Sequence, residues 1–400
     1  SWCRIAVLQS AYGKAGLLLR NLTAEPSGFL TEMTPENVTL LNQLAYMVGA
    51  SGDAKQVREL FDSFTGSGEM SRHRLAILAG LADGLQRSNH SLGELLGSGV
   101  PNADTTPDRL KDVLASASGT AEDVTRPEGE RVDAVRLLGL GSFSSSSSLL
   151  EQFLQPQHPE PIQVAAVRTL ADFSVPEATA LLLDGWARHS PSVRRVVLDT
   201  IFRNRAGAGA LLDAIEAGQL ARAEIEPARR AQLLNHPDGK IKDRAKAILA
   251  AEPNSDRRRV VAEFADVLQL EGDRTRGETL FAKHCLQCHT VQHVGKAVGP
   301  ELVGVRKRER VALLEDLLNP NAALSPAYVN YVVATKSGQV VTGIIVSETA
   351  SNITLRRPEA AEDTIPRDDI EEIRSTGQSL MPEGIEKSLT RQELADLIEY

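Results

Sequence analysis

Cys285-Leu286-Gln287-Cys288-His289 places two thiols three residues apart and an imidazole directly after the second thiol. A dithiol redox pair of the thioredoxin type would need a βαβ context, which the surrounding sequence lacks. A zinc site would need a second pair of ligands, and the only other cysteine is Cys3. The spacing instead matches the attachment signature of a c-type haem, in which two thioethers hold the porphyrin and His289 faces the iron.

The residues before this stretch follow a helical period. Gly277, Phe281 and Cys285 are spaced four residues apart, which places them on one stripe of a helix. That helix should run from about Arg276 into the two thiols. The pattern therefore predicts a helix that delivers the thiols to one end of a small helical domain.

A second helix is predicted at the C-terminal end. Thr390 is suited to be its N-cap, and Glu393, three residues later, completes a capping box. Leu397 and Tyr400 are three residues apart on this helix. The pair of helices resembles the class I cytochromes c, in which a glycine and an aromatic residue on the first helix meet a leucine and an aromatic residue on the last. In that family the glycine lets the two backbones cross closely.

Gly299-Pro300-Glu301-Leu302 resembles the loop that follows the attachment motif in the same family. The resemblance implies that the carbonyl oxygen of Pro300 accepts the Nδ1 proton of His289, which fixes the tautomer and orientation of the ring. It also implies apolar neighbours that exclude water from the haem and help to raise its potential. These neighbours are Phe281, Leu302 and Leu380.

A sixth iron ligand is predicted at Met381. It is the only one of the four methionines in the C-terminal part, and it lies in an irregular segment, residues 379–384, before the last helix. A thioether is a soft donor that favours ferrous iron. The alternatives are a methionine that fills a gap in the core, ligation by His284 or His293, and an open sixth position.

The composition narrows the class of protein. A chain of 400 residues allows roughly two or three domains. Hydrophobic residues make up 42% of the chain and aromatic residues only 4%, which is typical of a helix-rich protein. The net charge of −9 offers no basic surface for nucleic acid, and no apolar run is long enough to span a membrane.

The expected location follows from the haem chemistry. In bacteria c-type haem is attached outside the cytoplasm, so we expect a periplasmic or otherwise extracytoplasmic protein. The chain starts at Ser1 without an initiator methionine or a signal peptide, which we interpret as a piece of a longer protein that carries the export signal. Parts outside this chain could associate with a membrane. Cys3 is expected to be a buried structural thiol.

Residues 1–252 are predicted to be a helical repeat region. Residues 132–138 have self-similar copies at residues 164–170 and 193–198 and a weaker copy at residues 241–248. The pattern resembles HEAT repeats, which stack into an α-solenoid. A non-repetitive helical bundle is the alternative. The serine run Ser144–Ser148 predicts a solvated loop, and residues 253–270 predict a connecting helix.

Residues 271–400 form the predicted haem domain, with a β-rich insertion at residues 327–375. Residues 328–335 and 340–347 alternate in hydrophobicity and are joined by Lys336-Ser337-Gly338-Gln339, which is a hairpin signal. Shorter runs near residues 353, 364 and 370 could supply further strands. We expect a small antiparallel barrel or curled sheet, whose acidic edge could cover a haem edge or form a docking face.

The C-terminal part also resembles a more specific family, the haem-binding cytochrome c domain of the Pirellula/Verrucomicrobium type. The resemblance extends over residues 277–400 and rests on Gly-x-x-x-Phe, Cys-x-x-Cys-His, Gly-Pro-x-Leu, Leu-Asn-Pro, Ser-Leu-Met-Pro-Glu-Gly and a last helix ending in Asp-Leu-Ile-x-Tyr. Such domains end large membrane-bound dehydrogenases, after HEAT-like repeats and commonly an upstream β-propeller dehydrogenase domain. No part of this sequence has the strand pattern of a propeller, so substrate oxidation would lie outside the chain.

The hypothesis from sequence is a mainly α chain, with a HEAT-like α-solenoid followed by a class I cytochrome c domain. One covalent haem c would transfer single electrons between donor and acceptor proteins or domains, and the chain itself would be a carrier with no catalytic residues. One alternative is a haem enzyme or ligand sensor with an open sixth position. The other is a HEAT-type protein-binding scaffold with an accessory cytochrome.

Overall fold

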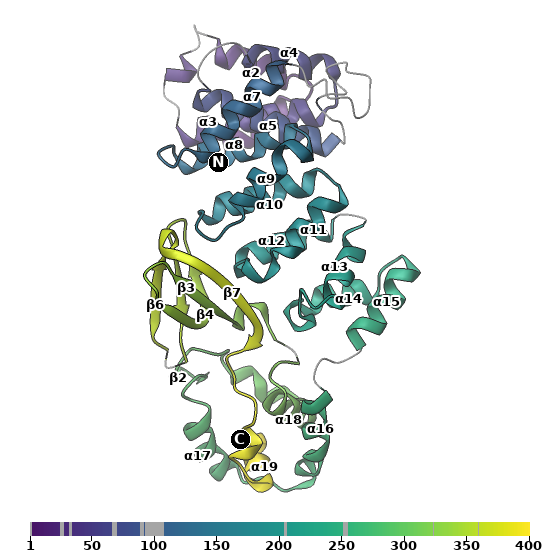
Figure 1. Ribbon diagram of the computed structural model, residues 1–400, viewed down its shortest axis with the longest axis vertical. Helices are drawn as coiled ribbons and strands as arrows, with labels where there is room; N and C mark the ends of the chain where they lie inside the picture. Colours follow the sequence, from purple (N-terminus) through teal and green to yellow (C-terminus); the bar gives the residue numbers. More distant parts are fainter. Residues whose placement is uncertain are drawn as a thin grey trace. The chain divides into compact units, whose positions relative to one another are not determined.

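The computed structural model describes residues 2–24, 28–31, 34–65, 70–88, 92, 108–203, 206–250, 255–322, 324–358 and 360–400 (Figure 1). The chain divides into two compact units. The first contains Ser1–Leu154 and Pro161–Thr179, and the second contains Gln155–Glu160 and Ala180–Tyr400. This division keeps residues 180–250 with the C-terminal part, and the domain boundaries predicted near residues 252 and 270 stay predictions.

The described part of the first unit is built from helices. Helix α4 shows why: Asp53 caps its N-terminus by accepting from the backbone N–H groups of Lys55 and Gln56, and Val57, Leu60, Phe61 and Phe64 form one buried stripe. The helices are α1 (Trp2–Ser10), α2 (Ala15–Thr23), α3 (Pro35–Ala50), α4 (Ala54–Phe64), α5 (Arg72–Ser88), α7 (Asp108–Glu122), α8 (Glu128–Leu137), α9 (Phe143–Phe153) and α10 (Glu160–Asp172). The side chain of Cys3 lies outside the described residues.

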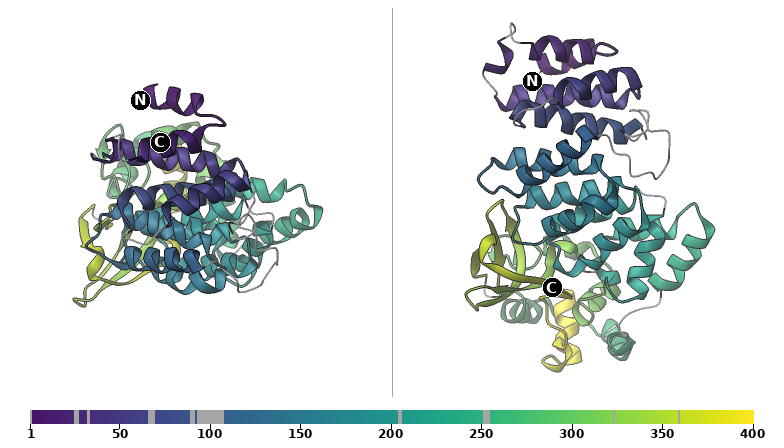
Figure 2. Two further views of the ribbon diagram at one scale, coloured as in Figure 1. Left: turned by 90° about the horizontal axis from the view of Figure 1, so that it is seen from above. Right: turned by 45° about the horizontal axis from the view of Figure 1, so that its top comes forward.

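Helices α3 and α5 lie side by side in this unit (Figure 2). Small residues allow the two backbones to come close. A Cβ atom on Gly49 would lie 2.5 Å from the carbonyl oxygen of Leu81, and Cβ atoms on Gly80 and Gly84 would overlap carbonyl oxygens of α3. The crossing therefore depends on glycine at the points of closest approach.

The serine run is helical, so the loop predicted for Ser144–Ser148 is wrong. Ser142 is the N-cap of α9 and forms a capping box with Ser145. The hydroxyl of Ser146 donates to the carbonyl oxygen of Leu138 at 3.0 Å in a buried position. Capping and burial of one face outweigh the weak helix propensity of serine.

The helices of the second unit are α11 (Pro176–Asp184), which begins in the first unit, α12 (Pro191–Ile201), α13 (Gly207–Glu216), α14 (Pro227–Leu234), α15 (Gly239–Ala250), α16 (Ser255–Glu263), α17 (Arg274–His284), α18 (Arg310–Leu318) and α19 (Arg391–Glu399). The predicted connecting helix consists of α16 and a 3-10 turn, Ala265–Gln269. The four self-similar segments fall in α8, α10, α12 and α15. HEAT-like stacking of these helices stays a prediction.

The inserted residues form the predicted antiparallel sheet. Its strands are β3 (Val329–Thr335), β4 (Val340–Glu348), β5 (Asn352–Arg356), β6 (Glu362–Pro366) and β7 (Ile370–Ser379), in the order β6-β5-β4-β3-β7. Side chains alternate along β3 between buried and half-buried positions, as the period of two predicts. Strand β7 continues past the predicted end of the insertion to Ser379, which pairs with Val329.

A buried polar cluster connects this sheet to helical segments of the same unit. The guanidinium of Arg194 donates to Glu224 and lies over the rings of Trp186 and Tyr331, at 4.7 and 5.2 Å from their centroids. Ser375 on β7 donates to the same Glu224 carboxylate at 2.9 Å. Because Arg194 and Glu224 are each about 5% exposed, the ion pair is almost completely removed from water.

Candidate haem site

Helices α17 and α19 cross at Gly277. A Cβ atom there would overlap the carbonyl oxygen of Asp396 and would lie 3.0 Å from the Cβ of Tyr400. One turn later on α17, the ring of Phe281 packs on that of Tyr400 with the centroids 5.3 Å apart. This is the glycine and aromatic arrangement that the sequence predicts.

The crossing is fixed by a buried carboxylate. Asp396 is 1% exposed and accepts from Arg276 at 2.7 and 3.0 Å, from the backbone N–H of Asp273 at 2.8 Å and from Gln392 at 3.0 Å. The hydrogen bonds from Arg276 lower the pKa of Asp396 to about 2. Asp396 therefore stays ionised and ties the first turn of α17 to α19.

The two thiols lie on the turn that follows α17. The N–H of Cys285 donates to the carbonyl oxygen of Phe281 at 2.8 Å, and the N–H of His289 donates to the carbonyl oxygen of Cys285 at 2.9 Å. Burial raises the pKa of the Cys285 thiol to about 12. Redox-active dithiols have lowered pKa values, so this environment argues against a thioredoxin-like pair and suits sulfur held in an apolar site.

The ring of His289 is held by the following loop. Its Nδ1 lies 2.8 Å from the carbonyl oxygen of Pro300, so Nδ1 carries the proton and donates. A Cβ atom on Gly299 would lie 2.5 Å from Cε1 of this ring and 2.8 Å from Nδ1. The loop folds back on the motif because Val298 and Gly299 both donate to the carbonyl oxygen of Cys288, at 2.9 and 2.6 Å. Nε2 is then the nitrogen left for a metal.

Met381 lies in a segment that is anchored on both sides. The N–H of Ser379 donates to the side chain of Asn321 at 2.8 Å, and the N–H of Met381 donates to the hydroxyl of Ser379 at 3.0 Å. Asn321 also donates to Glu383 at 2.8 Å. The side chain of Met381 is half-buried. These contacts position the segment, while the ligand role of Met381 stays a prediction.

His284 and His293, the alternatives to Met381 as iron ligand, lie on either side of the thiol motif. His293 is exposed and forms, with Gln292, a two-residue turn between β1 (Thr290–Val291) and β2 (Val294–Gly295). Both turn residues have positive φ values, 49° and 68°, as a tight hairpin of this type requires. His284 is the last residue of α17 and precedes Cys285 directly.

The apolar core around these helices has many members that remain partly exposed. Among the described residues, eight members of this core are buried and eleven more, including Phe281 and Cys285, are only partly buried. The core of the sheet has the opposite balance, with eleven buried members and only Tyr328 partly buried. A haem held at the two thiols would cover part of the half-buried surface of Phe281 and Cys285. The donor set of two thiols and one oriented imidazole also fits haem c.

The family model for cytochrome c matches residues 275–400. These residues are a cytochrome c domain. Such a domain binds haem covalently and carries electrons. No curated protein matches the chain. Among the described helices, none has the length and apolar character that crossing a membrane requires.

The sequence predicted the residues near the Cys285–His289 motif but not the contacts between residues far apart in the chain. Leu302, predicted as an apolar neighbour, is half-buried, and its N–H donates to Thr290 at 2.9 Å. The pair Arg276 and Asp396 was missed because charged residues on predicted helices are usually solvated. An aspartate between the apolar positions of the last helix was the available signal.

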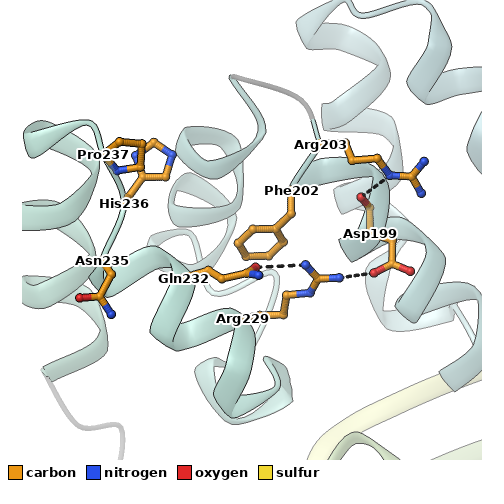
Figure 3. Close-up of a pocket in the computed structure, with 8 residues that line it drawn as sticks. All are labelled: Asp199, Phe202, Arg203, Arg229, Gln232, Asn235, His236 and Pro237. Carbon is orange, nitrogen blue, oxygen red and sulfur yellow. Dashed lines mark hydrogen bonds and ion pairs between the residues drawn. The ribbon is translucent and has the colours of Figure 1, made fainter. Parts of the chain in front are cut away.

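An open pocket lies outside the cytochrome c domain (Figure 3). One of the residues that line it is Arg229, whose guanidinium lies 4.9 Å from the ring of Phe202, donates to Gln232 at 3.0 Å and pairs with Asp199. Because this guanidinium already bonds to neighbouring side chains, the pocket is a weaker candidate than the haem site. It is lined by Asp199, Phe202, Arg203, Arg229, Gln232, Asn235, His236 and Pro237.

Proposed function

We propose that this chain transfers single electrons through one haem c attached at Cys285 and Cys288, with His289 as an axial ligand. Bound haem c supplies the ferric/ferrous couple. The observation that carries the proposal is the hydrogen bond of 2.8 Å between His289 Nδ1 and Pro300 beside the two thiols. This bond fixes the tautomer that leaves Nε2 for iron and increases the basicity of the ring.

Met381 is proposed as the second axial ligand. Its segment follows β7 directly and is held by Asn321 and Ser379, which limits the conformations of the thioether before it binds. Phe281, Leu302 and Leu380 would exclude water from the site, and a dry environment favours the less charged ferrous state.

The wider role is proposed from the family resemblance. The cytochrome c domain would be the electron-accepting C-terminal part of a larger extracytoplasmic dehydrogenase, with a β-propeller domain as one donor. The helical region would be a HEAT-like scaffold that separates donor and acceptor. Both redox partners would be proteins or domains, and any membrane association would come through other parts of the protein.

Optical and EPR spectra of the full chain, produced in a host that attaches c-type haem, test this proposal. The oxidised protein should be low-spin and show the far-red charge-transfer band of a thioether-ligated haem. Met381→Ala should remove this band and shift the iron toward high spin. Met47→Ala, which changes another half-buried methionine, should leave both features as they are.

Three results would contradict the proposal in different ways. A colourless protein, or a pigment extracted by acid acetone, would exclude covalent haem. A band that persists in Met381→Ala would exclude Met381 as the ligand. A high-spin wild-type iron that binds CO without losing a protein ligand would indicate a ligand sensor or haem enzyme.

A further inference from the structure

The end of the inserted sheet touches the loop that folds back on the thiol motif and also touches Cys288 itself. Arg356 is the last residue of β5, and its Nη1 donates to the carbonyl oxygen of Ala297 at 2.6 Å. Two residues later, the carbonyl oxygen of Pro358 lies 3.8 Å from Sγ of Cys288. Together the two contacts join the β5–β6 end of the sheet to Ala297 and to the second thiol of the motif.

The strand geometry directs Arg356 toward this loop. Ile353 and Leu355 are buried in the core of the sheet, so the alternation of β5 places Arg356 on the opposite face. Its guanidinium is also held by Glu362 on β6, at 2.9 Å from Nε and 2.7 Å from Nη2. The side chain is 28% exposed, and the ion pair orients it before it meets Ala297.

The contact point is close to the iron ligand in the chain. Ala297 precedes Val298 and Gly299, which both donate to the carbonyl oxygen of Cys288. Gly299 in turn lies against the ring of His289. A displacement of the loop at Ala297 would therefore reach the histidine ring through two residues.

We propose that Arg356 is a positioning residue that docks the inserted sheet onto residues 297–299 and thereby shields the Cys288 side of the haem from water. The inference rests on the proposed haem attachment. Shielding disfavours the more highly charged ferric state, so the docked sheet raises the reduction potential. The loop contact also limits the motion of the His289 ring.

The neighbouring arginine provides a matched control. Arg357 has a similar cross-strand partner, with its Nε 2.7 Å from Asp363, and is 47% exposed. Arg356→Ala removes the guanidinium that reaches Ala297, whereas Arg357→Ala removes a cation of the same strand end and leaves that contact in place. Comparing the two variants separates docking from a general change in charge.

The test uses the full chain with haem attached and combines a redox titration with hydrogen exchange of the peptide containing residues 296–299. In Arg356→Ala we expect a lower reduction potential and several-fold faster amide exchange in this peptide. Arg357→Ala should match the wild-type protein in both measurements. Equal potentials and equal exchange in the two variants would overturn the inference.

The two proposals fail in different ways. A chain that takes up no haem contradicts the proposed function, and hydrogen exchange still shows whether Arg356 holds the loop. A chain with haem in which Arg356→Ala changes neither measurement contradicts the docking inference alone.

Discussion

The carbonyl oxygen of Asp396 occupies the space that a side chain on Gly277 would need. The close approach brings α17 and α19 together in the turns around this point, where the rings of Phe281 and Tyr400 also meet. Because Cys285 directly follows α17, the crossing determines where the first thiol lies relative to the C-terminal helix.

Gly277→Ala should therefore lower the free energy of unfolding of the cytochrome c domain by about 2 kcal/mol, since overpacked contacts must be relieved by backbone shifts. Guanidinium unfolding followed at the haem absorption band measures the change. Gly209→Ala in α13 is the control, because its Cβ would meet only Ile241 at 3.7 Å. The control should be unchanged or more stable by up to about 1 kcal/mol.

Gly299→Ala should disturb the haem ligand rather than global stability. The new methyl group would press on the His289 ring, which must rotate or move away from Pro300. We expect altered EPR g values and a changed reduction potential, because the imidazole orientation and its hydrogen bond both affect the iron. Spectra identical to those of the wild-type protein would show that the loop does not hold the ring.

Asp396→Asn should remove an acid-sensitive contribution to stability of about 2 kcal/mol. The folded-state pKa of Asp396, about 2, is below its ordinary value of 3.8, so ionised Asp396 stabilises the fold fully above about pH 4. This contribution is lost as the pH falls toward 2. The difference in unfolding free energy between the two proteins should be constant at higher pH and shrink below pH 4. A difference independent of pH would refute this assignment.

Arg194→Met should destabilise the second unit by about 3–5 kcal/mol, because it leaves the buried Glu224 carboxylate without its cation. Replacing both partners by methionine should be less harmful than this single change, since no unpaired charge remains. Thermal unfolding of wild type, single and double variants measures the effect. A double variant that loses as much as the sum of its single variants would argue against coupling.

Local signals in the sequence predicted much of the site. The capping box of Thr390 and Glu393 is confirmed, with the Glu393 N–H donating to Thr390. The hairpin signal at residues 336–339 is confirmed by β3 and β4, and Gly338 has the positive φ of 85° that the turn needs. These features involve residues a few positions apart, so their physical causes lie within one short stretch of chain.

Contacts between distant segments were not predictable in the same way. Arg356 reaches Ala297 only because the register of the sheet places the end of β5 beside the loop, and that register is a tertiary property. The serine run Ser144–Ser148 shows that a prediction from local composition can also be wrong. Its composition predicts a loop, but a cap at Ser142 and a buried bond from Ser146 stabilise a helix.

The pairing of Val329 with Ser379 brings the first and last residues of the inserted sheet side by side. Because these two residues are neighbours, a short turn between them could replace the whole sheet. Deleting residues 330–378 and joining Val329 to Ser379 through a short glycine linker tests whether the shortened domain still takes up haem.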